Sequence, residues 1–271
     1  METEIYKYPR THHIEGSRCQ PGDEDLNSIP FSNIANRFVV IEEKVDGANC
    51  GVSFSSKGEM LLQSRGHFLT GGAREKHFNL FKTWANAHMK ELSEVLGNRY
   101  IMYGEWLYAK HTVFYNSLPH YFMEFDVYDK IQGYFLDTQS RRRMLKNHPF
   151  VNSVLVLYEG KLKKHNDLTV HLGKSNFITE SHINDLIDSC SNRNLISELV
   201  LKETDNSDLM EGLYIKVEED GKVMERYKFI RPSFLTSVVN SESHWLDRPI
   251  IPNILKPGAD MFRVGEGETC E

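Results

Sequence analysis

The chain has 271 residues, of which 40% are hydrophobic and 26% charged, and its formal net charge is −6. These values are typical of a soluble globular protein with one large domain, or one domain and a short appendage. No apolar run is long enough to span a membrane and no signal-peptide pattern begins the chain, so we expect an intracellular, cytoplasmic protein. The negative net charge argues against binding to nucleic acid through bulk charge alone, but it is compatible with a local basic groove.

The cysteines are scattered and form no Cys-x-x-Cys pair. They are Cys19, Cys50, Cys190 and Cys270. This spacing predicts reduced thiols and no structural zinc site.

Residues 1–36 are polar and irregular, and we interpret them as a lead-in packed on the main domain. Histidines and arginines cluster between Tyr8 and Arg18. Two interpretations stay open for them: they contact a phosphate or a nucleoside, or they are a solvated segment on the surface.

A lysine follows the first strongly apolar run. Residues 37–41 read as a strand that enters a core, and a second strand resumes at 50–54. Between them stand Lys44 and Gly47, in the pattern Lys-x-Asp-Gly. A lysine at the end of a buried strand is costly to keep charged, and beside cations or a phosphate it can lose its proton and act as a nucleophile. The alternative is a surface lysine paired with Glu43 or Asp46.

The next elements combine a hairpin and a helix. Residues 60–64 form the return strand, and Arg65 at its end suits either a phosphate or ribose ligand or a surface ion pair. Residues 74–96 carry apolar side chains at helical spacing, which predicts a helix packed on the core.

Strands with acidic and aromatic residues follow. The strand 99–107 contains Glu105, and the strand 121–129 contains Phe125. The basic run 139–146 predicts a helix, either facing RNA or solvated. We also expect a short strand at 154–157 and one or two helices within 181–201.

A hairpin closes the predicted domain. Asp220-Gly221 is a strong turn signal between strands at 211–217 and 223–231. Arg226 and Lys228 are two residues apart and should share one face of the return strand. We therefore expect a domain over 37–231, followed by an irregular, proline-rich tail over 232–271 that wraps it.

Six of these segments stand in the order of known motifs. They are Lys44-Val45-Asp46-Gly47-Ala48-Asn49, Ser64-Arg65-Gly66, Tyr103-Gly104-Glu105, Phe125-Asp126-Val127, Glu211-Gly212-Leu213-Tyr214-Ile215-Lys216 and Arg226-Tyr227-Lys228. Together they resemble the covalent nucleotidyltransferases, which include ATP-dependent polynucleotide ligases and mRNA capping enzymes. Asn49 resembles the RNA-ligase branch, which includes a phage RNA ligase and the kinetoplastid RNA-editing ligases, because DNA ligases and capping enzymes usually carry arginine there.

The sequence departs from the family pattern in two places. Arg226 stands where the last motif usually has its first lysine, which keeps the charge but changes its geometry. No OB-fold domain fits after Lys228, so we expect none, and a second protein that supplies substrate binding is one possible partner.

The resemblance implies an α+β fold: a two-sheet, mainly antiparallel, ATP-grasp-like nucleotidyltransferase domain with peripheral helices. It implies ATP, with Mg²⁺ or Mn²⁺, and a substrate RNA with 5′-phosphate and 3′-hydroxyl ends. Lys44 would form lysyl-AMP, pass the AMP to the 5′-phosphate and allow the 3′-hydroxyl to seal the strand, as in RNA repair.

The resemblance also assigns roles to the other motif residues. Catalysis would involve Lys44, Glu211, Arg226 and Lys228; nucleotide binding would involve Glu43, Asn49, Arg65, Glu105, Phe125, Lys216 and Lys228; a metal ion would be held by Asp46, Glu105 and Glu211. The alternatives are a nucleotide- or end-binding subunit without sealing activity, and a DNA ligase or capping-type nucleotidyltransferase.

Overall fold

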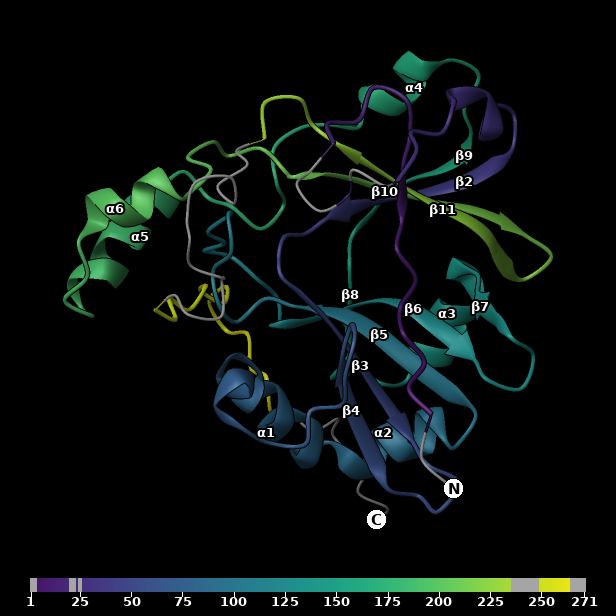
Figure 1. Cartoon of the computed structure of the whole chain (residues 1–271), viewed down its shortest axis with the longest axis horizontal. Helices are drawn as coiled ribbons and strands as arrows, with labels where there is room; N and C mark the ends of the chain where they lie inside the picture. The colour runs from purple at the N-terminus through teal and green to yellow at the C-terminus, as the bar shows by residue number, and fades with distance from the viewer. Residues whose placement is uncertain (1–3, 20–22, 24–25, 235–248, 264–271) are drawn as a thin grey trace, which may run out of the picture.

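The computed structural model describes residues 4–19, 23, 26–234 and 249–263 (Figure 1). Its strands are β1 (His12–His13), β2 (Phe38–Lys44), β3 (Ala48–Phe54), β4 (Met60–Ser64), β5 (Tyr100–Trp106), β6 (Phe122–Asp129), β7 (Tyr134–Leu136), β8 (Asn152–Ser153), β9 (Val156–Lys161), β10 (Gly212–Glu219) and β11 (Lys222–Ile230). They follow the path β4-β3-β5-β6-β7-β11-β10-β2-β9, while β1 pairs with β11 and β8 with β6.

The strands along this path form two halves of the sheet. One half contains β4, β3, β5 and β6, the other contains β11, β10, β2 and β9, and the short strand β7 joins them (Figure 1). Almost all neighbouring strands are antiparallel, so the predicted α+β, mainly antiparallel architecture is confirmed. The two sheets expected from the sequence are therefore connected through β7 into one hydrogen-bonded sheet.

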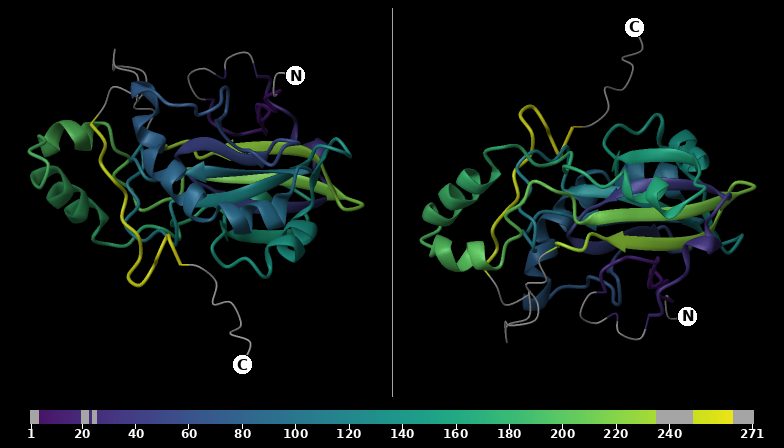
Figure 2. Two further views of the ribbon diagram at one scale, coloured as in Figure 1. Left: turned by 90° about the horizontal axis from the view of Figure 1, so that it is seen from below. Right: turned by 90° about the horizontal axis from the view of Figure 1, so that it is seen from above.

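The helices are peripheral to this sheet, as Figure 2 shows from below and above. They are α1 (Asn79–Ala87), α2 (Met89–Leu96), α3 (Thr138–Leu145), α4 (His165–Thr169), α5 (His182–Ser191) and α6 (Ser197–Lys202), with 3-10 turns at Phe31–Asn33 and Ala73–Phe78. The helix expected over 74–96 is divided at His88, whose backbone is not helical. The buried His88 ring stacks on Phe150 with a centroid distance of 4.7 Å, and this contact accompanies the break between α1 and α2.

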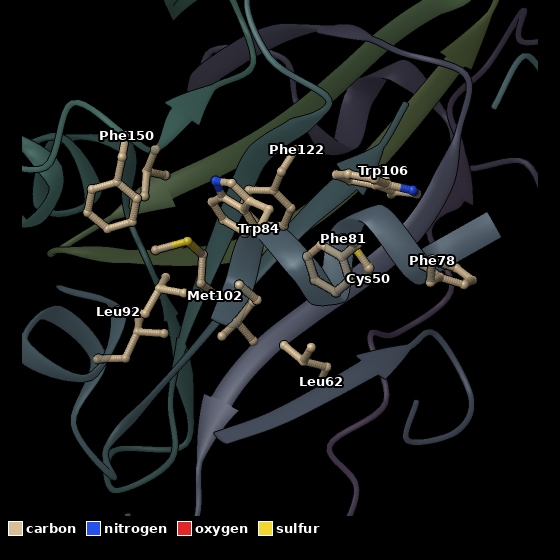
Figure 3. Close-up of a cluster of buried hydrophobic side chains, with 14 of the residues drawn as sticks. Cys50, Leu62, Phe78, Phe81, Trp84, Leu92, Met102, Trp106, Phe122 and Phe150 are labelled. Carbon is tan, nitrogen blue, oxygen red and sulfur yellow. The ribbon is translucent and has the colours of Figure 1, made fainter. Parts of the chain in front are cut away.

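The largest hydrophobic core lies between α1, α2 and the first half of the sheet (Figure 3). Trp84 is fully buried and stacks on Phe122 of β6 with ring centroids 4.9 Å apart. Phe81, one turn earlier, packs against Trp106 of β5. The apolar stripe predicted from helical spacing therefore faces the core.

One predicted strand has different bounds. Instead of 154–157, the structure has β8 and then β9 over Val156–Lys161. The amide of Val154 donates to the carbonyl of Glu124, and the carbonyl of Leu155 accepts from Glu43. These two residues cross from one half of the sheet to the other, which keeps them out of a regular strand.

Sterics explain why two of the motif positions are glycine. A Cβ atom at Gly212 would lie 2.0 Å from the carbonyl oxygen of Phe229, and one at Gly47 would lie 2.7 Å from that of Trp106. Both positions exclude a side chain because backbone from a neighbouring strand passes close by.

The segments outside the predicted domain are built into it where they are described. β1 pairs in parallel with β11, with His13 opposite Lys228. Residues 249–263 run beside the 108–118 segment, where Asn253 donates its amide to Tyr108 and Ile254 to Tyr115. Much of the expected tail, 235–248 and 264–271, lies outside the described residues. None of the described helices is both long enough and apolar enough to cross a membrane.

We predict that Trp84→Ala lowers the free energy of unfolding by about 3–5 kcal/mol, because it removes a fully buried indole and leaves a cavity. Urea unfolding followed by circular dichroism measures this. Leu199→Ala on α6, where the side chain is 56% exposed, is the control and should change stability by about 0.5 kcal/mol or less. A loss below about 1 kcal/mol for Trp84→Ala would contradict the packing described for this core.

Candidate active site

Lys44 and Glu211 meet because of the register between β2 and β10. Gly212 lies opposite Lys44 in this antiparallel pair, so Glu211, one residue before β10, comes beside the end of β2. The Lys44 Nζ donates to Glu211 Oε2 at 2.7 Å. The lysine side chain is 23% exposed and the glutamate 2%, so the pair opens to solvent on the lysine side.

The first half of the sheet brings Glu105, together with Asn49, close to the Lys44–Glu211 pair. Asn49 on β3 lies directly opposite Glu105 on β5. The Asn49 Oδ1 atom is buried and has no hydrogen-bond partner among the described residues, as expected of a group that awaits a ligand. Arg65, exposed just beyond β4, is close enough to lower the pKa of Glu105.

Burial and neighbouring charges shift the pKa values of the groups in this cluster. Burial raises the pKa of the Glu105 carboxyl to about 7, against the positive charges of Lys44 and Arg65. Burial also raises the pKa of Glu211, against the charge of Lys44. For Lys44, burial acts to lower the pKa, but Glu211, Glu105 and Asp46 outweigh it and raise the pKa above its usual value. In the free protein Lys44 is therefore a protonated ammonium group.

Asp46 is anchored by backbone groups. Its Oδ2 atom accepts the amide hydrogens of Thr112 at 2.6 Å and Val113 at 2.8 Å. Its own amide donates to the Tyr115 hydroxyl at 2.8 Å. Asp46 thus fixes the 112–115 segment beside the lysine, and one of its carboxylate oxygens is already engaged.

Among the described residues, the carboxylates near Lys44 have the chemistry, but not the full ligand set, of a metal site. Within residues 4–19, 23, 26–234 and 249–263, no three Asp, Glu, His or Cys side chains stand together in a metal-binding arrangement. Glu105 and Glu211 are nevertheless close enough for the charge of Glu211 to act on the pKa of Glu105, and carboxylate oxygens suit a hard cation. Mg²⁺ commonly takes only one or two carboxylates and completes its shell with water and phosphate oxygens. The pair fits such an ion.

Lys228 shares the face of Lys44. It lies opposite Tyr214 on β10, two residues from Gly212, which lies opposite Lys44. Directly opposed residues, and residues two apart, project from the same face of a sheet. Lys228 is close enough to Lys44 and Glu211 for their charges to affect its pKa, which burial lowers.

Lys216 and Arg226 share that face but lie further along the strands. Lys216 lies opposite Arg226 on β11 and opposite Val40 on β2. Val40 is four residues before Lys44 along β2. At about 3.3 Å per residue this is about 13 Å from the lysine's own position. The structure thus places these two predicted phosphate ligands away from the Lys44–Glu211 pair.

Lys216 and Arg226 instead belong to a buried ionic network. Lys216, fully buried, contacts Glu42 Oε2 at 2.9 Å and Asp126 Oδ1 at 3.1 Å, and Arg226 lies 3.7 Å from Asp126 Oδ2. Arg141 of α3 pairs with Glu42 at 2.7 Å and also with Glu124. The network therefore connects β2, β6, β10, β11 and α3. The first arginine of the basic run on α3 is neither solvated nor available to RNA.

Phe125 lies between the two halves of the sheet and is covered by the N-terminal segment. The Tyr8 ring meets it edge-on, with centroids 5.2 Å apart, and the Tyr8 hydroxyl donates to Asp126 at 2.5 Å. The Tyr214 ring also lies near Phe125, with centroids 6.2 Å apart, and its hydroxyl contacts that of Tyr8. Only 9% of Phe125 is exposed, so its predicted stacking on a base requires Tyr8 or Tyr214 to shift.

Glu43 projects from the opposite face to its neighbour Lys44, as alternation along a strand requires. It accepts hydrogen bonds from Ser175 Oγ at 2.6 Å and from Asn176 Nδ2 at 2.8 Å. Asn176 and Phe177 also line a pocket of about 450 Å³. Glu43 is thus held beside this pocket, and not in the cluster around Lys44.

Several contacts in this region were not predicted from the sequence. The role of the N-terminal segment was open, yet Tyr8 and His13 are buried, with exposed fractions of 4% and 3%. Asp126, beyond its place in a motif, and Ser175 and Asn176 had no predicted role. For the N-terminal segment, the only sequence signal was the run of aromatic and basic residues near Tyr8. No sequence pattern marked Ser175 and Asn176.

The RNA ligase family model matches residues 37–230, and the chain belongs to this family. Two mutants of Naegleria gruberi RNA ligase are similar in fold: one, solved with ATP and Mn, has a TM-score of 0.52 at 17% identity, and the other, with AMP and Mn, has 0.51 at 16%. The matches cover 85% and 84% of this chain but only 57% and 56% of those chains. No curated protein sequence matches the chain.

We predict that Glu105→Gln changes the pH dependence of stability. Because folding raises the pKa of Glu105 from 4.5 to about 7, the wild-type protein loses stability as pH rises through this window, and glutamine removes the effect. The free energy of unfolding of the variant, relative to wild type, should therefore increase from about pH 5 to about pH 8 in urea titrations.

Glu94→Gln, an exposed position on α2, is the matched control and should show no such trend. An equal difference between Glu105→Gln and wild type at both pH values would mean that Glu105 is not the perturbed carboxyl group.

Proposed function

We propose that this chain is an ATP-dependent RNA ligase that joins 5′-phosphate and 3′-hydroxyl ends through lysyl-AMP and AMP-capped RNA. The observation that carries the proposal is the 2.7 Å contact between Lys44 and Glu211, with Glu105 and Lys228 brought beside it from distant parts of the chain. Membership of the RNA ligase family supports it.

In the first step the Nζ of Lys44 attacks the α-phosphorus of ATP. An N–P bond forms, the bond to the pyrophosphate oxygen breaks, and pyrophosphate leaves with its electron pair. The approach must be in line with that leaving group, and positive charge must neutralise the phosphate oxygens. Lys228, on the same face of the sheet as Lys44, is placed to supply such charge.

The lysine must first lose a proton. Glu211 accepts a hydrogen bond from the ammonium group at 2.7 Å and orients it, and the proton would leave to water. A Mg²⁺ or Mn²⁺ ion, with Glu105, Glu211 and Asp46 as its ligands, would supply positive charge that offsets the carboxylates raising the pKa of Lys44. The Naegleria ligase structures with Mn agree with this choice of ion.

In the later steps the AMP passes from Lys44 to the 5′-phosphate of RNA, and a 3′-hydroxyl then displaces it. The unpaired Oδ1 of Asn49 and the exposed Arg65 are placed near Glu105 to bind ribose, phosphate or the 3′-hydroxyl strand. Phe125 would stack on the adenine, and Glu43 would lie near the edge of the base. Arg226 and Lys216 would act through the ionic network that supports Phe125, whose carbonyl accepts from Lys216.

RNA repair is the process that this chemistry suits, because broken strands supply the two ends. A second protein that helps to bind the RNA is also part of the proposal.

We predict that incubation with labelled ATP and Mg²⁺ gives a covalent protein–AMP adduct that is stable to denaturing gel electrophoresis. Lys44→Arg keeps the positive charge but removes the nucleophilic amine, so it should give no labelled band. Lys90→Arg, on the exposed surface of α2, should label as wild type does. An undiminished band in Lys44→Arg, or none in wild type, would reject the proposal.

We predict further that the protein seals a nick in a duplex with RNA on the 3′-hydroxyl side at least about 10-fold faster than one with DNA there, because a 2′-hydroxyl offers an extra hydrogen bond. Denaturing gels of the four RNA and DNA combinations measure the rates. Adduct formation without any sealing would favour the nucleotide- or end-binding subunit, and equal rates would favour a DNA ligase.

A further inference from the structure

Three basic side chains converge on one carboxylate beside the proposed nucleophile. Asp23 Oδ1 lies 3.1 Å from Arg10 Nη2, and Asp23 Oδ2 lies 3.2 Å from His13 Nε2. The ammonium group of Lys228 donates to the same Oδ2 atom. Arg10 and His13 belong to the N-terminal segment, and Lys228 belongs to β11. The pairing of β1 with β11 places His13 opposite Lys228.

Several basic groups gather on this side of the site. Arg10 and Lys228 are cations that share the anion Asp23. Burial lowers the pKa of both His13 and Lys228, and the charge of Lys44 also acts to lower each of them, while Glu211 acts to raise that of Lys228. Basic groups gathered in this way attract an anion with more than one negative charge.

The geometry of the cluster is that of an oxyanion site. Each Asp23 oxygen accepts from at least one basic group, as the oxygens of a phosphate do when arginine and lysine bind it. The site is reachable, since the side chain of Arg10 is 41% exposed and that of Asp23 is 16% exposed. The His13 ring is held in place through its other nitrogen by Ser17 Oγ at 2.7 Å.

We infer that Arg10, His13 and Lys228 form a phosphate subsite next to Lys44, which Asp23 fills in the free chain and vacates when a phosphate group binds. The inference rests on the proposed function for the identity of its ligand: either the β- and γ-phosphates of ATP, which leave as pyrophosphate, or the 5′-terminal phosphate of the RNA. Asp23 is then a resident counterion that competes with the phosphate.

The test measures binding of inorganic pyrophosphate to the whole chain by isothermal titration calorimetry at low salt. Asp23→Asn removes the competing charge and should bind pyrophosphate about 10-fold more tightly than wild type. Arg10→Gln removes one ligand and should bind it about 10-fold more weakly. Because the two variants are expected to change affinity in opposite directions, a general loss of folding cannot produce both results.

Matched controls are available on another part of the surface. Arg143→Gln on α3 and Glu159→Gln on β9 change the same charges at exposed positions and should leave pyrophosphate binding unchanged. Weaker binding by Asp23→Asn would show that the carboxylate orders the basic groups and does not compete for them. Equal binding by wild type, Asp23→Asn and Arg10→Gln would show that the cluster is a structural ion pair. Either result overturns the subsite.

Two short RNA oligonucleotides, one with a 5′-phosphate and one with a 5′-hydroxyl, separate the two sources of phosphate. Asp23→Asn should tighten pyrophosphate binding in either case. If the subsite takes the RNA end, Asp23→Asn should also tighten binding of the phosphorylated strand and not of the hydroxyl strand; if it takes ATP phosphates, both strands should bind as they do to wild type. These are binding measurements, so they do not depend on ligation. A protein that binds pyrophosphate as expected but forms no AMP adduct would reject the ligase and keep the subsite.

Discussion

The register between β2 and β10 is the constraint on which the site depends. It places Gly212 opposite Lys44, so that Glu211 meets the lysine amine, and it places Lys228 on the same face through the pairing of β10 with β11. A shift of one residue would turn every one of these side chains to the other face. Gly212 lets β11 approach β10 closely at this point, because the carbonyl of Phe229 passes where a Cβ atom would be.

The position of Glu105 relative to Lys44 depends on how the two halves of the sheet are held together. Glu105 arrives from β5, while Lys44 and Glu211 belong to β2 and the start of β10. The buried network of Glu42, Asp126, Lys216 and Arg141 joins strands from both halves beneath this point. Charges buried without partners are strongly destabilising, so this network permits only a narrow range of arrangements between the halves. The buried ionic network therefore helps to position the cluster around Lys44, although its own side chains do not contact Lys44.

Sequence patterns predicted most of the long strands, but not the break at His88, the bounds of β9 or the contacts between elements. The hairpin at Asp220-Gly221 was predicted correctly because both residues adopt the positive φ that such a turn requires. The shared face of Arg226 and Lys228 was predicted from alternation, but the distance of Arg226 from Lys44 depends on the register with β10, which no local pattern encodes. The same holds for Tyr8, whose neighbours Phe125 and Tyr214 are far from it in sequence.

The proposed reaction bonds the Lys44 amine to the phosphorus of AMP. Peptide mass mapping after incubation with ATP and Mg²⁺ identifies the modified residue without a variant. One AMP is expected on the peptide that contains Lys44, and on no other peptide. AMP on a different lysine, or on a histidine of the N-terminal segment, would rule out Lys44 as the nucleophile.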